Sequence, residues 1–425
     1  MIDARGVVLL TLLPTLTLAS AQGVVERFGE DSRSSRAGTR INAVRALAAS
    51  KHPRAVELAA PLLLDANDGV QLETIDAILS LYLAPAPSQR QSSPFEIRNG
   101  SAAESIFEAA PLAVLPHEVP PVVIQNLVKG LGDESTRVRV NGAFALGVLA
   151  SGAVSPLSPD AARTLSEQLV HSMRHEDPAT REALVRVVGR IYATRPGTSG
   201  SVVIGDALVA ALNDVDSRVR TWAADSLGWL RYERAVQALT DRLNHLRRSD
   251  EGDATLHALA RIGHSSSQTI LNGRVEDRRA TLRVMAIEGL GRVGDSRAVP
   301  TITAAIQRER DEAVRLAGAF TLLKLGDVSH VQAIVAALIR SGTARQAQVY
   351  LTELGASIAP ALHPSLQHTN PAIRQAVAEV LGLSGHAGSI EALEAVRQDP
   401  DPAVKEAVRQ ALVRLRALPN GVLVH

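Results

Sequence analysis

The C-terminal half of the chain repeats itself about every 31 residues, and this feature limits the possible folds more than any other. One phrase, with Arg or Lys at its second position and Leu at its ninth, returns as VRTWAADSLG (219–228), LRVMAIEGLG (282–291), VRLAGAFTLL (314–323), IRQAVAEVLG (373–382) and VKEAVRQALV (404–413). Repetition at this period is typical of solenoids, in which each unit buries its apolar face only against its neighbours. We therefore expect an elongated stack of similar units.

Each unit holds two short segments in a fixed order. The ninth residue of the phrase serves as an anchor, and the anchors recur at intervals of 29 to 32 residues at Leu227, Leu259, Leu290, Leu322, Leu351, Leu381 and Leu412. A second phrase lies between anchors as AVQAL (235–239), AVPTI (298–302), HVQAI (330–334), IAPAL (358–362) and SIEAL (389–393). Apolar residues of the last unit recur at helical spacing, so both segments are predicted to be helices. Pro300 and Pro360 stand at the start of second segments, where a helix tolerates proline.

The turns that precede the first segments carry Asp or Asn a few residues before a basic residue. The acidic or amide residues are Asp214, Asp216, Asp277, Asp311, Asn370, Asp399 and Asp401, and the basic ones are Arg220, Arg283, Arg315, Arg374 and Lys405. We expect the side-chain oxygens to cap the following helices. We also expect each basic side chain to bond the Asp of an adjacent unit, forming a polar ladder along the stack. A pattern present in every unit indicates architecture rather than a reaction centre.

These two phrases resemble the HEAT repeat, in the short form found in phycobilisome lyase subunits and in many bacterial scaffold proteins. The resemblance is strongest over 203–416, continues over 130–202, and is weaker around RINAVRALA (40–48) and VQLETIDAILS (70–80). It implies an all-α fold, an α-solenoid of about ten stacked antiparallel helix pairs. It also implies partner binding rather than a particular reaction.

The N-terminus has the features of an export signal. Residues 6–18 are almost entirely apolar, and Ala19-Ser20-Ala21 is a small-x-small cleavage site. We predict a signal peptide over 1–21, a flexible segment over 22–37, the solenoid over 38–416 with an irregular part at 84–130, and a tail over 417–425. An uncleaved anchor and a first solenoid helix are the alternatives. After cleavage we expect a monomer in the periplasm or cell envelope, without a membrane span.

No catalytic, cofactor-binding or metal site is predicted. The chain has no cysteine and a net charge of +1, and it lacks the Gly-x-Ser-x-Gly and phosphate-loop motifs. His171 and His175 are four residues apart, but no third metal ligand accompanies them. Trp222 and Trp229 are assigned to core or groove packing. We expect neither a cofactor nor a nucleic-acid partner.

The functional prediction is a non-catalytic scaffold that binds a protein partner through its concave face or one loop edge. Three loop-like insertions, 84–94, 151–160 and 194–201, follow first segments and are expected on one edge. The second helices are expected to line the concave face and to offer an acidic partner the residues Arg242, Arg247, Arg248, Arg308, Arg310 and Arg340. The alternatives are a lyase-like or other chromophore-handling enzyme, and a purely structural envelope protein with a smooth, uncharged concave surface.

Overall fold

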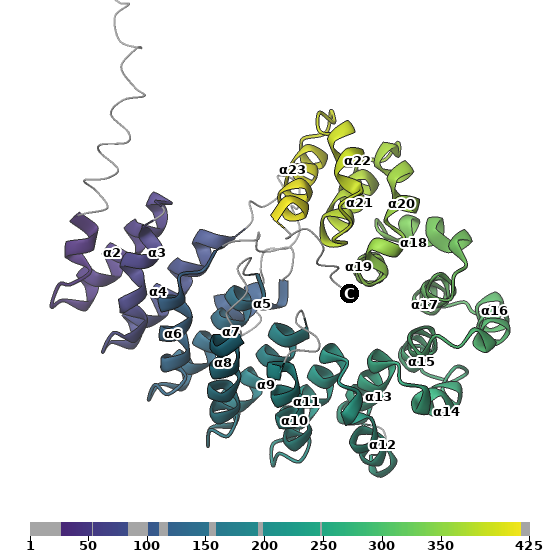
Figure 1. The fold of residues 1–425 in the computed structure, drawn as a ribbon, viewed down its shortest axis with the longest axis horizontal. Helices are drawn as coiled ribbons and strands as arrows, with labels where there is room; N and C mark the ends of the chain where they lie inside the picture. Colours follow the sequence, from purple (N-terminus) through teal and green to yellow (C-terminus); the bar gives the residue numbers. More distant parts are fainter. Residues whose placement is uncertain are drawn as a thin grey trace, which may run out of the picture.

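The protein is a curved stack of short helices (Figure 1). The computed structural model describes residues 27–52, 54–83, 101–109, 118–152, 159–193, 199–246 and 249–417. Within these ranges the regular structure consists of α-helices and short 3-10 helices, and there is no β-strand. The predicted all-α solenoid is therefore confirmed. Residues 1–21, which carry the predicted export signal, lie outside the described residues.

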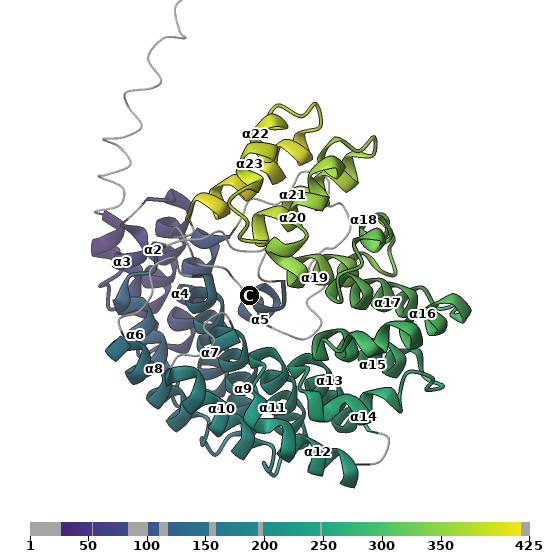
Figure 2. The same cartoon turned by 45° about the vertical axis from the view of Figure 1, so that its right-hand side comes forward.

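The helices form two rows, one inside the arch and one outside (Figures 1 and 2). The inner row holds the first helices of the units: α2 (Ala37–Ser50), α4 (Asp68–Tyr82), α7 (Thr136–Gly152), α9 (Pro178–Ala193), α11 (Ser217–Leu230), α13 (Asp250–Ile262), α15 (Ala280–Val293), α17 (Glu312–Lys324), α19 (Ala344–Leu354), α21 (Pro371–Leu383) and α23 (Pro402–Ala417). The outer row holds the second helices: α3 (Ala55–Ala59) with η1 (Ala60–Leu64), α6 (Pro121–Gly130), α8 (Pro159–Ser172), α10 (Ser199–Ala211), α12 (Val236–His245), α14 (Gln268–Asn272), α16 (Val299–Arg308), α18 (Val331–Ala337), α20 (Ala359–Leu362) with η7 (His363–Gln367), and α22 (Ser389–Ala395). In the described part of the chain this makes ten pairs followed by α23, in agreement with the prediction.

The first helices, not the second, line the concave face, and the prediction on this point was wrong. Most neighbouring inner helices, such as α11 and α13, pack closely against one another, whereas most neighbouring outer helices contact each other little. Glycines permit the close inner packing: a Cβ on Gly228 would lie 2.9 Å from the Ala258 Cα, and one on Gly382 would lie 2.6 Å from the Ala411 Cα. Because the inner helices are more closely spaced than the outer ones, the stack curves around them.

The helix ends follow the predicted turn chemistry. Asp216 and Asp311 each accept hydrogen bonds from two backbone N–H groups of the next helix, and Asn370 accepts one. Pro300 and Pro360 lie in the first turns of α16 and α20, where their missing N–H costs no helical bond. Several inner helices then end at a glycine with positive φ, as at Gly263 and Gly294. These local signals set where each helix begins and ends.

The predicted ladder is present and consists of arginine–carboxylate pairs between successive units. The pairs are Arg40–Asp65, Arg139–Asp177, Arg181–Asp214, Arg220–Glu251, Arg283–Glu309 and Arg374–Asp399, with N···O distances of 2.7 to 3.1 Å. Each arginine also donates to backbone carbonyls before its own helix, as Arg181 does to His175 and Glu176. The ladder is interrupted at Arg315, whose ion pair is with Glu312 of the same helix at 3.8 Å. Where the ladder is continuous, each arginine links the turn before its own helix to the next unit.

The irregular region contains a helix that leaves the stack. In the inner row α4 packs directly against α7, while α5 (Ala102–Ala109) lies inside the arch against α7 (Figures 1 and 2). The three insertions follow α4, α7 and α9, which are all inner helices. Most of the insertion residues, including 84–94, 153–158 and 194–198, lie outside the described residues.

In the part of the chain that the structure describes, no helix combines the length and the apolar character needed to cross a membrane.

Candidate partner-binding face

Four of the six arginines selected from the sequence lie in the described part of the chain, and these four belong to the outer row or to the turns that follow it (Figure 1). Arg242 and Arg308 belong to α12 and α16 of the outer row, and Arg310 and Arg340 lie in turns that follow outer helices. Arg242 forms an ion pair with Glu251, and Arg340 lies 3.6 Å from Glu312. Arg308 and Arg310 are exposed. Arg247 and Arg248 lie outside the described residues.

The charged side chains of the concave face come from the inner helices, and one group of them holds α5. Arg186 of α9 bonds two carboxylates of α5, Glu104 at 2.7 Å and Glu108 at 2.6 Å. Arg190, one turn later, donates to the carbonyl oxygen of Phe107. Two acidic side chains one turn apart on α5 thus converge on the guanidinium of Arg186, while Arg190 bonds the backbone of the same helix.

Aromatic rings complete the contact between α5 and the inner row. The Phe107 ring is 2% exposed and lies 5.3 Å from the Phe144 ring of α7. The Arg186 guanidinium lies over both Phe144 and Trp222, at 4.8 and 4.5 Å from the ring centres. Cation–π contacts and charge-assisted bonds reinforce each other in this geometry. The concave face here binds an acidic amphipathic helix, and that helix is part of the same chain.

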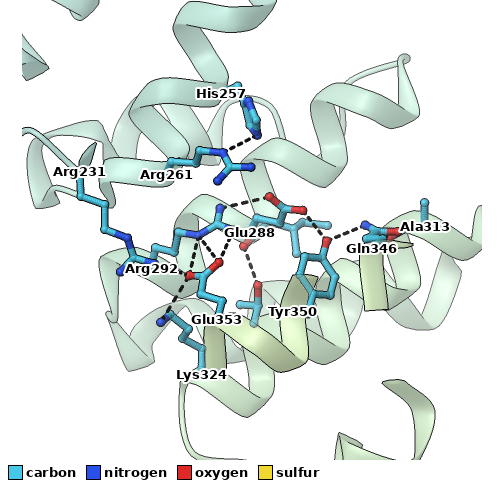
Figure 3. A network of polar contacts seen from close by, with 12 residues as sticks. Arg231, His257, Arg261, Glu288, Arg292, Ala313, Lys324, Gln346, Tyr350 and Glu353 are labelled. Carbon is cyan, nitrogen blue, oxygen red and sulfur yellow. Dashed lines mark hydrogen bonds and ion pairs between the residues drawn. The ribbon is translucent and has the colours of Figure 1, made fainter. Parts of the chain in front are cut away.

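A second polar cluster lies where the C-terminal ends of several inner helices converge (Figure 3). Glu353 of α19 accepts hydrogen bonds from Arg292 at 2.8 Å and from Arg231 at 2.9 Å, and it lies 3.5 Å from the Lys324 ammonium. Arg231 is 122 residues away in sequence. Burial raises the pKa of Glu353, but the bonds and charge of Arg292, aided by Arg231 and Lys324, outweigh burial and lower the pKa to about 2. Glu353 therefore ties four inner helices together as a carboxylate.

Arg231 reaches this cluster from an unusual backbone conformation. It has a φ of 50° at the end of α11, where the next two inner helices have Gly263 and Gly294. A left-handed conformation costs a non-glycine residue about 1 kcal/mol or more. The ion pair with Glu353 offsets that cost.

The same cluster extends deeper to Tyr350 and Glu288. The Tyr350 hydroxyl donates to Glu288 and accepts from the Gln346 amide at 2.6 Å. Glu288 also accepts from Arg292 at 3.1 Å. Burial, followed by the negative charge of Glu288, raises the pKa of Tyr350 well above its usual value. The phenol therefore remains a hydrogen-bond donor.

A third group on the concave face combines Trp229, Arg261, His257 and Asp225. The Arg261 guanidinium lies 3.6 Å from the centre of the Trp229 ring, and its Nε–H donates to His257 Nε2 at 3.0 Å. His257 Nε2 therefore carries the lone pair, so its Nδ1–H donates to Asp225 at 3.2 Å. Burial, with repulsion from Arg292, lowers the pKa of Arg261 to about 10. The Trp229 ring is 47% exposed.

Trp222 and Trp229 were assigned to packing from the sequence, and the charged residues of these clusters were not predicted, although their positions are regular. Two residues after the anchor leucine, or its equivalent Val188, successive units carry Arg190, Trp229, Arg261, Arg292, Lys324 and Glu353. Two residues before it they carry Arg186, Asp225, His257 and Glu288. These positions are four apart, so they share one helix face. The signal was therefore a column of charged and aromatic residues at fixed offsets from the anchors.

A cleft of about 360 Å³ opens where the ladder is interrupted, between α16, α17 and α18. Its polar lining includes Arg315 and Arg340, and both lie within 4 Å of Glu312. Its cations thus already share a carboxylate, which makes the cleft a weaker candidate than the concave face.

His171 and His175 form no metal centre with their neighbours. His171 is exposed at the end of α8, and His175 Nδ1 accepts from the Asp177 N–H in the following turn at 3.0 Å. Across the described residues no three potential His, Asp or Glu ligands cluster in the way that a metal ion requires.

Comparisons with known proteins address the fold. Yeast importin-beta (Kap95p) superposes with a TM-score of 0.57 at 12% identity, covering 93% of this chain and 57% of that one. The CpcE–CpcF complex of phycocyanin lyase from Nostoc sp. PCC7120 gives a TM-score of 0.39 at 19% identity, covering 61% of this chain and 96% of that one. An engineered protein gives a TM-score of 0.38 at 17% identity, covering 92% of this chain and 99% of that one.

Sequence comparison gives the family. No curated protein matches the chain in sequence. The sequence model of the HEAT repeats matches residues 169–260, 267–352 and 343–413, which together make up more than half of the chain. With the stacked helix pairs and the superposition on importin-beta, this match shows that the chain belongs to the family of HEAT-repeat proteins.

Proposed function

We propose that the protein is a monomeric, non-catalytic scaffold whose concave face binds an acidic helical segment of a protein partner. The observation that carries this proposal is α5, an acidic amphipathic helix seated on the inner row through Arg186 and Arg190. Helix binding in a groove of this kind depends on an apolar anchor flanked by charge, as Phe107 is flanked by Glu104 and Glu108. HEAT repeats in general mediate protein interactions, and a long concave surface suits distributed contacts.

The charged inner face also bears on the alternative functions. A purely structural envelope protein was expected to have a smooth, uncharged concave surface, whereas the inner helices here end in the half-exposed Arg231 and the partly exposed Lys324 (Figure 3). A lyase-like enzyme needs a large apolar or acidic-lined pocket for its chromophore, and the polar side chains of the inner helices count against that interpretation. Partner binding is therefore the function that the geometry favours.

Site-specific photo-cross-linking in the cells that make the protein tests this function. A benzophenone amino acid in place of the exposed Trp229 of the inner row should form a covalent adduct with a discrete protein, and the linked segment should be acidic and helical. The matched control replaces Val203, which is 38% exposed on the outer helix α10. Adducts from position 203 alone would refute the concave assignment, and adducts from neither position would refute the scaffold.

We further propose that the protein is exported and works in the cell envelope, on the basis of the apolar run at 6–18 and the small residues at 19–21. Mass spectrometry of the protein purified from its own cells should give a mature N-terminus near Gln22. An intact Met1 on the bulk of the protein would reject export by this signal.

A further inference from the structure

Among the arginines of the inner face that stack on aromatic rings, Arg261 is the one that lacks an oxygen partner. Arg186 bonds Glu104 and Glu108, Arg190 bonds a carbonyl, and Arg292 bonds Glu288 and Glu353. For Arg261 the bond to His257 is the interaction found within the described residues, and no carboxylate there lies within 4 Å of its guanidinium. Its terminal nitrogens are not sealed from solvent. They can therefore receive a ligand from outside.

The surroundings of Arg261 hold fewer negative than positive charges and offer a flat apolar surface. Arg231, Arg292, Lys324 and Arg261 itself are four cations, and the carboxylates that act on Arg261 are three, those of Glu288, Glu353 and Asp225, so the cations outnumber the anions. Burial is the main cause of the lowered pKa of Arg261, and repulsion from Arg292 adds to it, while the three carboxylates only partly oppose these effects. The adjoining Trp229 ring, about half exposed, can cover the methylene groups of an incoming side chain.

The geometry of α5 shows what such a guanidinium binds in this protein. Arg186 also lies over an aromatic ring, Trp222, which is on the same helix α11 as Trp229, and Arg186 receives glutamate side chains. A planar guanidinium with two free terminal nitrogens matches a carboxylate in a two-pronged contact. His257, held by Asp225, fixes the orientation of the guanidinium from the other side.

We propose that Arg261, over Trp229, binds a carboxylate side chain of the partner's acidic helix. This inference rests on the proposed function and deepens it by naming one contact. The ligand is an aspartate or glutamate of a protein segment, whose methylene groups lie on the indole and whose carboxylate supplies the missing negative charge.

Calorimetric titration of the purified full chain with a synthetic peptide tests the proposal. The probe is SAAESIFEAA, the acidic sequence at 101–110 that the inner row already holds, and its partner peptide has both glutamates replaced by glutamine. We expect Arg261→Met to weaken binding of the acidic peptide at least tenfold, and Arg261→Lys to weaken it less. The glutamine peptide should bind wild type and Arg261→Met with equal, low affinity. Arg297→Met, at a side chain that is 86% exposed, is the control and should change nothing.

Each other outcome overturns the proposal in an identifiable way. Equal binding of the acidic peptide to wild type and Arg261→Met, or no binding to wild type, removes Arg261 as the carboxylate site. If Arg186→Met abolishes binding instead, the peptide replaces α5, and the proposed function stands while this inference fails. If acetate competes at concentrations similar to those of the peptide, the site takes small carboxylates and not a protein segment. Circular dichroism of each variant verifies that the helices remain.

Discussion

Replacing Gly382 by alanine is expected to lower the stability of the C-terminal end of the solenoid by about 2 kcal/mol, within the usual range for overpacked cores. The added Cβ would lie 2.6 Å from the Ala411 Cα and 2.8 Å from its Cβ, so α21 and α23 would have to separate. Backbone atoms cannot move aside as a flexible side chain can. Hydrogen exchange should therefore speed up over α23, and the thermal midpoint should fall.

The matched control is Gly142→Ala in α7, another buried inner-row position. There the nearest atom to a new Cβ is the Leu127 carbonyl oxygen at 4.0 Å, which is an ordinary contact. Alanine favours a helix interior over glycine by about 1 kcal/mol, so this variant should be as stable as wild type or more stable. If Gly382→Ala were as stable as Gly142→Ala, the claim that close packing of the inner row requires glycine at position 382 would be wrong.

Replacing Glu353 by glutamine is expected to cost about 3 kcal/mol at neutral pH. Glutamine is nearly the same size, but it removes the negative charge shared by Arg231, Arg292 and Lys324. Arg292, with a side chain only 4% exposed, would keep Glu288 as its one carboxylate. Breaking a buried ion pair from one side typically costs 3 to 5 kcal/mol, because a buried charge is left without its partner. Urea unfolding, followed by far-ultraviolet circular dichroism, measures the loss.

The same carboxylate gives the wild type a specific pH dependence. Its pKa is about 2 when folded and near 4.5 when unfolded, so the unfolded state binds the proton more readily. The stabilisation is complete above pH 4.5 and is lost as the pH falls from 4.5 towards 2. Glu353→Gln should lack this component. Glu312→Gln, at an exposed side chain with ion pairs of 3.6 to 3.8 Å, is the control and should change stability by less than about 0.5 kcal/mol. Parallel stability curves for wild type and Glu353→Gln between pH 2 and 5 would contradict the assignment.

Much of the architecture was predictable because it depends on local, repeated signals. The spacing of the anchor leucines gave the helix pairs, Asp216 and Asp311 gave helix starts, and the Asp–Arg pattern gave the ladder. Two ladder positions use Glu251 and Glu309 where aspartate was expected, since the longer side chain spans the same gap between units. The glycines of the Leu-Gly phrase, which lie in the first helices, indicate which row packs more closely. The concave face was nevertheless assigned to the second helices.

The candidate site was not predictable in the same way. Arg186 meets Glu104 because α5 lies inside the arch (Figures 1 and 2), and Arg231 meets Glu353 because the inner helices converge across three units. Neither contact follows from the period of the repeat, since each joins residues from non-equivalent positions in distant units.

The sequence by itself determined the unit: a pair of helices that cannot bury its apolar face alone and therefore stacks on copies of itself. The tertiary structure decided which row faces inward and which charges meet there. The physical reason is that stacking depends on contacts between neighbouring units, whose residues recur every 31 positions, whereas curvature accumulates over many units. Small differences in helix spacing, such as those allowed by Gly228 and Gly382, add up until distant side chains lie within bonding distance.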